Sequence, residues 1–276
     1  MGQLKFRPRT LDDDIIKEGL CAVGTLENLP QSKKMCFVVG GIATQSYFPT
    51  VFRRPTSDID LAVLRPLNFE EFKDFASPAI EYLRDKRYDV KAKKGHLSHQ
   101  ILFSNEDEGT KAVIEFPRRN GDNYIKRQER LEREMENTRI KIIEDRSQAY
   151  RVSSPEDIIV PKLVRGVNSL SRNPDFCAFV ESGTPVVFTD EKINEELKRI
   201  RELREEAILH IGDVKLTETL RFVSDIFDIR ALSEVVGYNE GYLARAVDSW
   251  DVLRTKTTAR DLLVNYLLPK INNSLT

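Results

Sequence analysis

The chain has 276 residues, enough to bury one large core or two ordinary ones. Its 43 Lys and Arg residues nearly balance 44 Asp and Glu residues, so the net charge is −1. This excludes a positive potential over the whole protein that would attract nucleic acid, but it allows a local basic patch. No apolar run approaches the roughly 20 residues of a membrane span, and the N-terminus lacks a signal-peptide pattern, which predicts a cytoplasmic protein with no membrane partner. The cysteines, without CxxC spacing, are expected to be packing residues: Cys21, Cys36 and Cys177.

The first half alternates short β-rich runs with turns and charged stretches, which predicts strands and helices of a mixed α/β domain. The predicted strands are residues 36–39, 59–64, 100–103 and 112–116. The polar segment 104–109 favours a hairpin, so the last two strands are expected to be antiparallel. Helices are expected over residues 42–47, over 68–84 with a bend at Pro78, and over 124–137.

From Ser154 onward the pattern is helical only. Ser154 can cap a helix, Pro155 suits its first position, and Glu156 and Asp157 favour its N-terminus. Further helices are expected over 191–209, 215–235, 240–253 and 259–271. The sequence therefore predicts an α/β (α+β) fold, with a mixed β-sheet domain flanked by helices in residues 1–153 and an all-α domain in residues 154–276.

Two glycines follow the first predicted strand. Gly40 and Gly41 let the backbone turn tightly and approach a phosphate closely, and the start of the next helix offers free N–H groups to an anion. A Gly-Gly pair after a strand is by itself more often only a turn.

Two carboxylates share one face of the second predicted strand. Side chains alternate along a strand, so Asp58 and Asp60 project together, opposite Ile59 and Leu61, with Cα atoms roughly 6.6 Å apart. Like charges at this spacing are costly unless a cation neutralises them, and Mg²⁺ or Mn²⁺ held by carboxylates and substrate phosphates is the expected solution. The alternative is a pair of charges that protects an exposed edge strand.

A third carboxylate, Glu115, interrupts the apolar strand 111–116 and is the candidate that completes a metal site, unless it only faces solvent. Arg53 and Arg54 precede the acidic strand and could contact the β- and γ-phosphates of a triphosphate. The alternative is that these arginines are solvated loop residues.

In the helical half, Lys162 is expected among inward-facing apolar residues, where its ammonium would need an anion such as a nucleotide phosphate, or would extend to solvent. Arg221, Asp225 and Asp228 follow one helical face and could also form only a surface ion pair. His96 and His99 are expected in a loop without companion ligands, which argues against zinc, and His210 at a helix C-terminus.

The residues above resemble the nucleotidyltransferase superfamily, defined by a strand, Gly-Gly or Gly-Ser, a short helix and Asp-x-Asp. More narrowly, three motifs resemble the AbiEii-type branch, known for toxins of type IV toxin–antitoxin systems. They are Val39-Gly40-Gly41, Arg54-Pro55-Thr56-Ser57-Asp58-Ile59-Asp60-Leu61, and Ser154-Pro155-Glu156-Asp157-Ile158-Ile159 with Lys162. The branch's Arg-x3-Asp-x2-Asp pattern is matched by residues 221–228, while Arg172-Asn-Pro-Asp175 is a competing match nearer Lys162.

The resemblance implies transfer of NMP from NTP to a tRNA end or a protein, with NTP bound in a cleft between the domains, and a cognate antitoxin. It implies a catalytic set of Asp58, Asp60, Glu115 and Lys162, the first three holding metal. The implied substrate-binding set is Gly40, Gly41, Arg53, Arg54, Thr56, Arg221, Asp225 and Asp228. The sequence departs from the family in the sixteen residues between Gly41 and Asp58, a longer spacing whose loop carries Arg53 and Arg54, and in Glu rather than Asp at position 115. The alternatives are a non-catalytic nucleotide-binding regulatory protein and an antibiotic-type small-molecule transferase.

Overall fold

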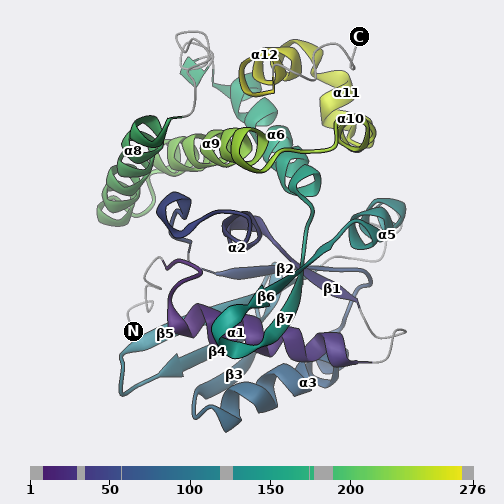
Figure 1. The fold of residues 1–276 in the computed structure, drawn as a ribbon, viewed down its shortest axis with the longest axis vertical. Coiled ribbons are helices and arrows are strands. Elements are labelled where there is room, and N and C mark those ends of the chain that lie inside the picture. The colour runs from purple at the N-terminus through teal and green to yellow at the C-terminus, as the bar shows by residue number, and fades with distance from the viewer. Residues whose placement is uncertain are drawn as a thin grey trace. The chain divides into compact units, whose positions relative to one another are not determined.

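The computed structural model describes residues 9–29, 35–56, 58–118, 127–173, 175–176 and 189–268. The chain folds as two compact units, Met1–Ser154 and Pro155–Thr276, each taken by itself below. The first runs from purple to teal in Figure 1 and contains the sheet, and the second, from teal to yellow, is helical. The predictions made for Ser57, Pro174, Cys177, residues 124–126 and residues 269–271 lie outside the described residues.

Seven strands form one mixed sheet within the described part of the first unit, in the order β3-β4-β5-β2-β1-β7-β6. Strand β1 is antiparallel to β2 and parallel to β7, and β2 is parallel to β5. The predicted mixed sheet is therefore confirmed, as is the antiparallel pair around residues 104–109, β4 and β5. The strands are β1 Cys36–Val39, β2 Ile59–Val63, β3 Asp89–Lys94, β4 Ser98–Asn105, β5 Thr110–Pro117, β6 Arg139–Ile143 and β7 Gln148–Val152.

The sequence pattern missed the strands β3, β6 and β7. Strand β3 is rich in lysine and buries only Val90, and β6 buries only Ile143, so neither shows the apolar alternation of a half-buried strand. Both are the edge strands of the sheet, where charged side chains are common.

Helices of the first unit are α1 Asp14–Thr25, α2 Gly40–Gln45, α3 Phe69–Asp85 and α5 Gln128–Glu136. Helix α3 begins with a capping box in which the Asn68 side chain accepts from the Glu71 backbone and the Glu71 side chain accepts from the Asn68 backbone. Helix α2 begins at Gly40 rather than at Ile42, so the two glycines belong to its first turn. Helix α1 was not predicted.

The two faces of the sheet carry different layers. Helix α1 packs closely on one face: a Cβ atom added to Gly19 of α1 would lie only 2.6 Å from Cδ1 of Ile59 in β2. The other face carries a smaller apolar cluster in which Phe37 and Ala62 pack against Leu131 of α5. Because side chains alternate along β2, Asp60 shares the face of Ala62 and lies opposite Ile59, as predicted.

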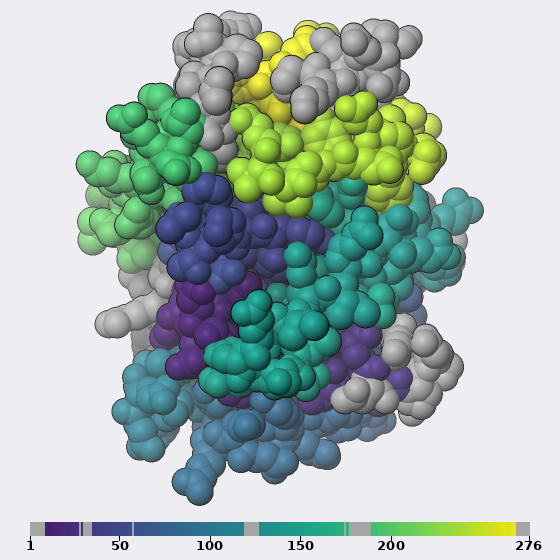
Figure 2. Space-filling view, viewed as in Figure 1, coloured from purple at the N-terminus to yellow at the C-terminus, as the bar shows by residue number. Residues whose placement is uncertain are grey.

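In the second unit, α6 contacts α9, α10, α11 and α12 (Figure 1). The predicted helix 240–253 is two helices, because residues Ser249 and Trp250 interrupt it. In the space-filling view, the yellow-green segments of this unit, which include α9 and α10, form a band across its visible face (Figure 2). The helices are α6 Pro155–Arg172, α8 Asp190–Leu209, α9 Val214–Ala231, α10 Glu240–Asp248, α11 Asp251–Thr255 and α12 Thr257–Leu267, with a π-helical turn at Leu232–Val236.

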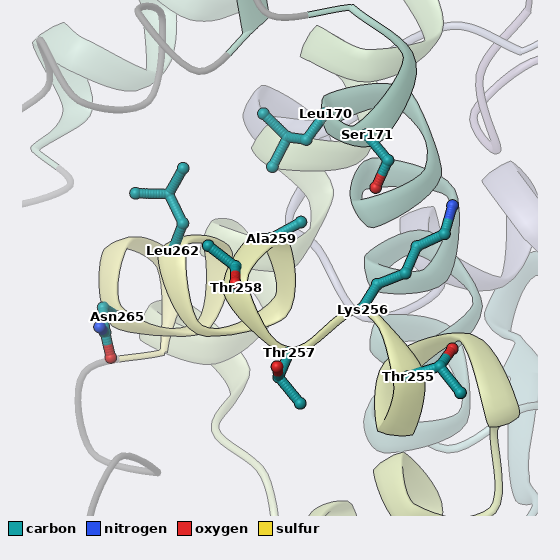
Figure 3. Close-up of a pocket in the computed structure, with 9 residues that line it drawn as sticks. All are labelled: Leu170, Ser171, Thr255, Lys256, Thr257, Thr258, Ala259, Leu262 and Asn265. Atoms are coloured by element: carbon teal, nitrogen blue, oxygen red, sulfur yellow. The ribbon is translucent and has the colours of Figure 1, made fainter.

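An open hollow of about 590 Å³ lies between α6 and α12 (Figure 3). Leu170 and Ser171 line it from α6, and Leu262 and Asn265 line it from α12. None of the predicted site residues lies in its lining.

Cys21 and Cys36, in the first unit, are buried free thiols, in agreement with a packing role. Among the described helices, none combines the length and the apolar character of a membrane span.

Candidate metal centre

Three carboxylates converge on one face of the sheet. Asp58 directly precedes β2, Asp60 lies in β2, and Glu115 lies in the adjacent parallel strand β5, where it is the register partner of Asp60. Each offers one carboxylate oxygen, and these oxygens all lie within 4.8 Å of one another. The three residues are half-buried. The structure therefore brings together the acidic residues that the sequence proposed as a set.

The donor set fits a hard divalent cation. Mg²⁺ takes oxygen ligands at about 2.1 Å in an octahedron, so opposite ligands lie about 4.2 Å apart. Oxygens within 4.8 Å of one another reach that spacing with small side-chain movements. Three close carboxylates also repel one another in the absence of a cation. Since octahedral oxygen sites suit Mg²⁺ and Mn²⁺ alike, the ligand types do not choose between these ions.

The glycine pair packs directly against the acidic strand. Gly40 has φ +70°, a conformation that favours glycine, and a Cβ atom there would lie 2.5 Å from Oδ2 of Asp60. A Cβ atom on Gly41 would lie 2.8 Å from Oγ1 of Thr56. The Thr56 hydroxyl in turn donates to Oδ1 of Asp58, at 3.3 Å. The Gly-Gly motif thus has a packing reason: it leaves room for the carboxylate of Asp60 and for Thr56.

Gln100 orients the third carboxylate. It lies in β4 opposite Glu115, and its Nε2 donates to Oε1 of Glu115 over 2.6 Å. A partner of this kind fixes the direction in which a metal-binding carboxylate points. Gln100 was expected in a strand but without a role, because only the cross-strand register shows that it faces Glu115.

The two predicted phosphate-binding arginines lie in structured surroundings rather than in a solvated loop. Arg53 forms an ion pair with Asp12, and its Nε donates to the carbonyl of Phe48 at 3.0 Å. Arg54 is buried, and its carbonyl accepts a hydrogen bond from Gln45 Nε2 at 2.8 Å.

In the second unit, Lys162 is 2% exposed and bonds to two aspartates. Its Nζ donates to Oδ2 of Asp228 at 2.7 Å and to Oδ1 of Asp225 at 3.2 Å. These carboxylates supply the anion that the buried ammonium requires. Arg165, one turn beyond Lys162 on α6, binds Asp225 with two hydrogen bonds of 2.7 and 2.8 Å, whereas Arg221 is exposed on α9. Arg165 was not predicted as a site residue, although its i+3 spacing from Lys162 was a usable signal.

The start of α6 holds two more buried acids. Asp157 accepts from the hydroxyl of Tyr242 at 2.8 and 2.9 Å, and Glu156 accepts from the backbone N–H of Asn239 at 2.6 Å. These bonds join α6 to α10 and its N-cap. Glu156 and Asp157 therefore do more than favour a helix N-terminus.

The expected loop position of His99 is wrong. His99 is buried in β4, where its ring stacks on Phe72 and its Nε2 bonds to the carbonyl of Leu67 at 3.0 Å. Burial lowers the pKa of His99 below its usual value. The loop prediction failed because β4 begins at Ser98, before the apolar run that signalled it. His210 ends α8 as its C-cap residue, as predicted.

No model of a known protein family matches the chain, and no curated protein matches it. A solved structure similar to the chain is that of an antigenic nucleotidyltransferase-like protein from Paracoccidioides brasiliensis. The two share 13% sequence identity and a TM-score of 0.37 over 90% of this chain and 92% of the other. So weak a likeness carries no weight for function, and a functional assignment has to rest on the geometry of the metal centre.

Proposed function

We propose that this protein is a metal-dependent nucleotidyltransferase that transfers NMP from an NTP to an acceptor and releases pyrophosphate. The observation that carries the proposal is the convergence of the Asp58, Asp60 and Glu115 carboxylates within 4.8 Å, beside the Gly40-Gly41 turn. Carboxylates from one sheet face leave the remaining coordination positions of an ion open to substrate phosphates, which is how Mg²⁺ is usually held.

In this proposal Asp58, Asp60 and Glu115 bind Mg²⁺ or Mn²⁺. Once bound, such ions neutralise charge on the phosphates and make an acceptor hydroxyl a better nucleophile. Gln100 keeps the Glu115 carboxylate directed at the ion, and Thr56 does the same for Asp58. The protein's own contribution is then mainly the positioning of charges before the substrate arrives.

The motif resemblance supports further substrate contacts, which we include as proposals. Gly40 and Gly41 let the triphosphate approach the backbone, and Arg53 and Arg54 contribute positive charge to its phosphates. Residues 1–153 carry the chemistry, while residues 154–276 contribute nucleotide-binding groups. In that helical part Arg221 is the proposed nucleotide contact, because it is exposed. Lys162, Asp225 and Asp228 are buried and bind one another, so we propose that they position the helices around the nucleotide rather than touch it.

The same resemblance supports an RNA or protein acceptor and the role of a type IV toxin that a cognate antitoxin neutralises. Growth arrest on expression of the wild-type chain, but not of an Asp58→Asn, Asp60→Asn variant, would support the toxin role. Normal growth with the wild type would refute that role and leave the chemistry untouched. A nucleotide that binds but is never consumed would favour a regulatory protein, and label on an aminoglycoside would favour a small-molecule transferase.

The decisive experiment incubates the protein with each α-³²P-labelled NTP, Mg²⁺ or Mn²⁺, total RNA and protein extract. The wild type is expected to transfer label, and the Asp58→Asn, Asp60→Asn variant is not. Glu108→Gln, at an exposed carboxylate in the β4–β5 turn, is the matched control and should retain transfer. Binding of Mn²⁺, followed by the loss of the free-ion EPR signal, tests the metal centre independently of turnover. Unchanged Mn²⁺ binding by the double variant would contradict the proposed site.

A further inference from the structure

A row of polar side chains leads from the metal centre to the edge of the sheet. The strand register pairs Asp60 with Glu115, Glu115 with Gln100, and Gln100 with Lys93. Paired residues of adjacent strands project to the same face, so Lys93 shares the face of the carboxylates. Three steps between strands, of about 4.8 Å each, place the Cα atom of Lys93 roughly 14 Å from that of Asp60.

Two more lysines belong to this face by the alternation of side chains. Lys91 lies two residues before Lys93 on β3, and Lys111 lies four residues before Glu115 on β5. Lys91 and Lys93 are exposed and Lys111 is half-buried. We call Lys91, Lys93 and Lys111 the lysine face. Lys94, also exposed on β3, belongs to the opposite face.

The described helices packed on this part of the sheet, α1 and α3, lie on the opposite face. Helix α3 contacts β3 and β4, and α1 contacts β5. Phe72 and Phe75 of α3 stack edge-on against Phe116, the neighbour of Glu115 that points away from the metal centre. The lysine face is therefore the side of β3, β4 and β5 that these helices leave uncovered.

Outside the metal centre, the described residues of this face of β3, β4 and β5 carry three lysines against one carboxylate, Asp89. Among the described residues, neither Lys93 nor Lys111 has a carboxylate within ion-pair distance, while Lys91 bonds to Asp89 at 2.8 Å. Half-buried Gln100, Leu102 and Ser104 of β4 lie between these lysines, so the centre of the face is mainly polar. A phosphodiester backbone complements such a surface, whereas protein interfaces rely on buried aromatic or apolar anchors.

We propose that the lysine face binds the phosphates of a single-stranded nucleic acid whose terminal hydroxyl reaches the metal centre. This inference rests on the proposed nucleotidyltransferase function and names its acceptor class. Lysine ammonium groups act as point charges for phosphates without selecting bases, so the face positions a strand rather than reading its sequence. The row from Lys93 to Asp60 gives the strand a direct path to the metal centre.

The test measures binding of a 5′-fluorescein-labelled oligouridylate by anisotropy at several salt concentrations, without NTP or divalent metal. Each phosphate contact contributes about 0.7 to the salt dependence of single-strand binding, so Lys93→Gln with Lys111→Gln should lower the log–log slope by about 1.4. A fourfold rise in salt then weakens the wild type about sevenfold more than the double variant. Lys94→Gln, on the other face of β3, is the matched control and should keep the wild-type slope.

An unchanged slope in the double variant, or an equal loss in Lys94→Gln, would overturn the proposal. The proposal would also be overturned if the wild-type protein bound no oligonucleotide and transferred label only to protein. Unchanged Mn²⁺ binding by the double variant would show that its fold and metal centre are intact. The Asp58→Asn, Asp60→Asn variant should still bind the oligonucleotide, because its lysines are unchanged. If the wild type also bound the oligonucleotide through these lysines but transferred no label, only the proposed enzymatic function would be contradicted.

Discussion

The contact between Gly40 and Asp60 allows a sharp test of the metal centre. In Gly40→Ala, the new Cβ atom would lie 2.5 Å from Oδ2 of Asp60, closer than such atoms approach, so the carboxylate has to move. The alanine would also adopt φ +70°, which costs about 1–2 kcal/mol for a residue with a Cβ atom. We expect two effects, a loss of stability from the backbone and a loss of metal affinity from the displaced carboxylate.

Gly109 separates these effects. It has φ +60°, but a Cβ atom there would meet nothing within 4 Å. Gly109→Ala should therefore have the same backbone cost as Gly40→Ala and leave the carboxylates in place. For a unit of about 150 residues, 1–2 kcal/mol lowers Tm by roughly 2–8 °C in both variants. Only Gly40→Ala should also bind Mn²⁺ more weakly, by about 10- to 100-fold, the loss typical of a disturbed ligand orientation.

Thermal unfolding followed by circular dichroism measures the first effect in the full chain, and Mn²⁺ titration followed by EPR measures the second. The comparison is made at a temperature at which both variants are folded. If Gly40→Ala binds Mn²⁺ as tightly as Gly109→Ala, the packing of Gly40 against Asp60 does not position a ligand, and the reasoning from geometry to metal site is wrong.

Two further predictions concern buried ionisable groups. Lys162→Met removes the ammonium between two buried aspartates and should lower the free energy of unfolding of the helical unit in urea by about 3–5 kcal/mol. Arg221→Met, on the exposed face of α9, should change it by less than about 0.5 kcal/mol. Equal effects of the two substitutions would contradict the assigned contacts. Burial lowers the pKa of His99, so below a pH of about 6.5 the unfolded state binds more protons at this residue than the folded state. The contribution of neutral His99 to folding stability is therefore present above a pH of about 6.5 and is lost as the pH falls. In His99→Gln, the fall of Tm between pH 7 and pH 5 should be shallower, and an unchanged fall would exclude His99 as its source.

Local patterns were sufficient to predict the acidic strand and its glycine turn. Alternation along a single strand put Asp58 and Asp60 on one face, and no knowledge of neighbouring strands was needed. The start of α6 at Pro155 and the bounds of α8 and α9 were likewise predicted within a few residues, because apolar periodicity and helix-start signals are local. Glu115 was also predicted, because a single acid in an otherwise apolar strand needs an explanation.

Contacts between distant segments account for what was missed. Gln100 faces Glu115 through the register of β4 on β5, and Arg165 meets Asp225 across two helices 60 residues apart in sequence. A single sequence does not state which distant residues pair. The edge strand β3 was missed for another reason: its exposed lysines break the apolar alternation that marks a half-buried strand.

The long segment between the glycine pair and the acidic strand, residues 42–57, shows why motif spacing is a weaker constraint than motif geometry. Gln45, the last residue of α2, ties this segment together and to the chain before α1. Its Nε2 donates to the carbonyl of Arg54 at 2.8 Å, and its Oε1 accepts from the backbone of Leu11 at 2.7 Å. The chain thereby returns Thr56 to Gly41, next to the acidic strand. Because closing a longer loop costs only about 0.6 kcal/mol per doubling of length, a few fixed contacts can offset extra residues. The departure in spacing is therefore compatible with the convergence of the carboxylates that carries the proposed function.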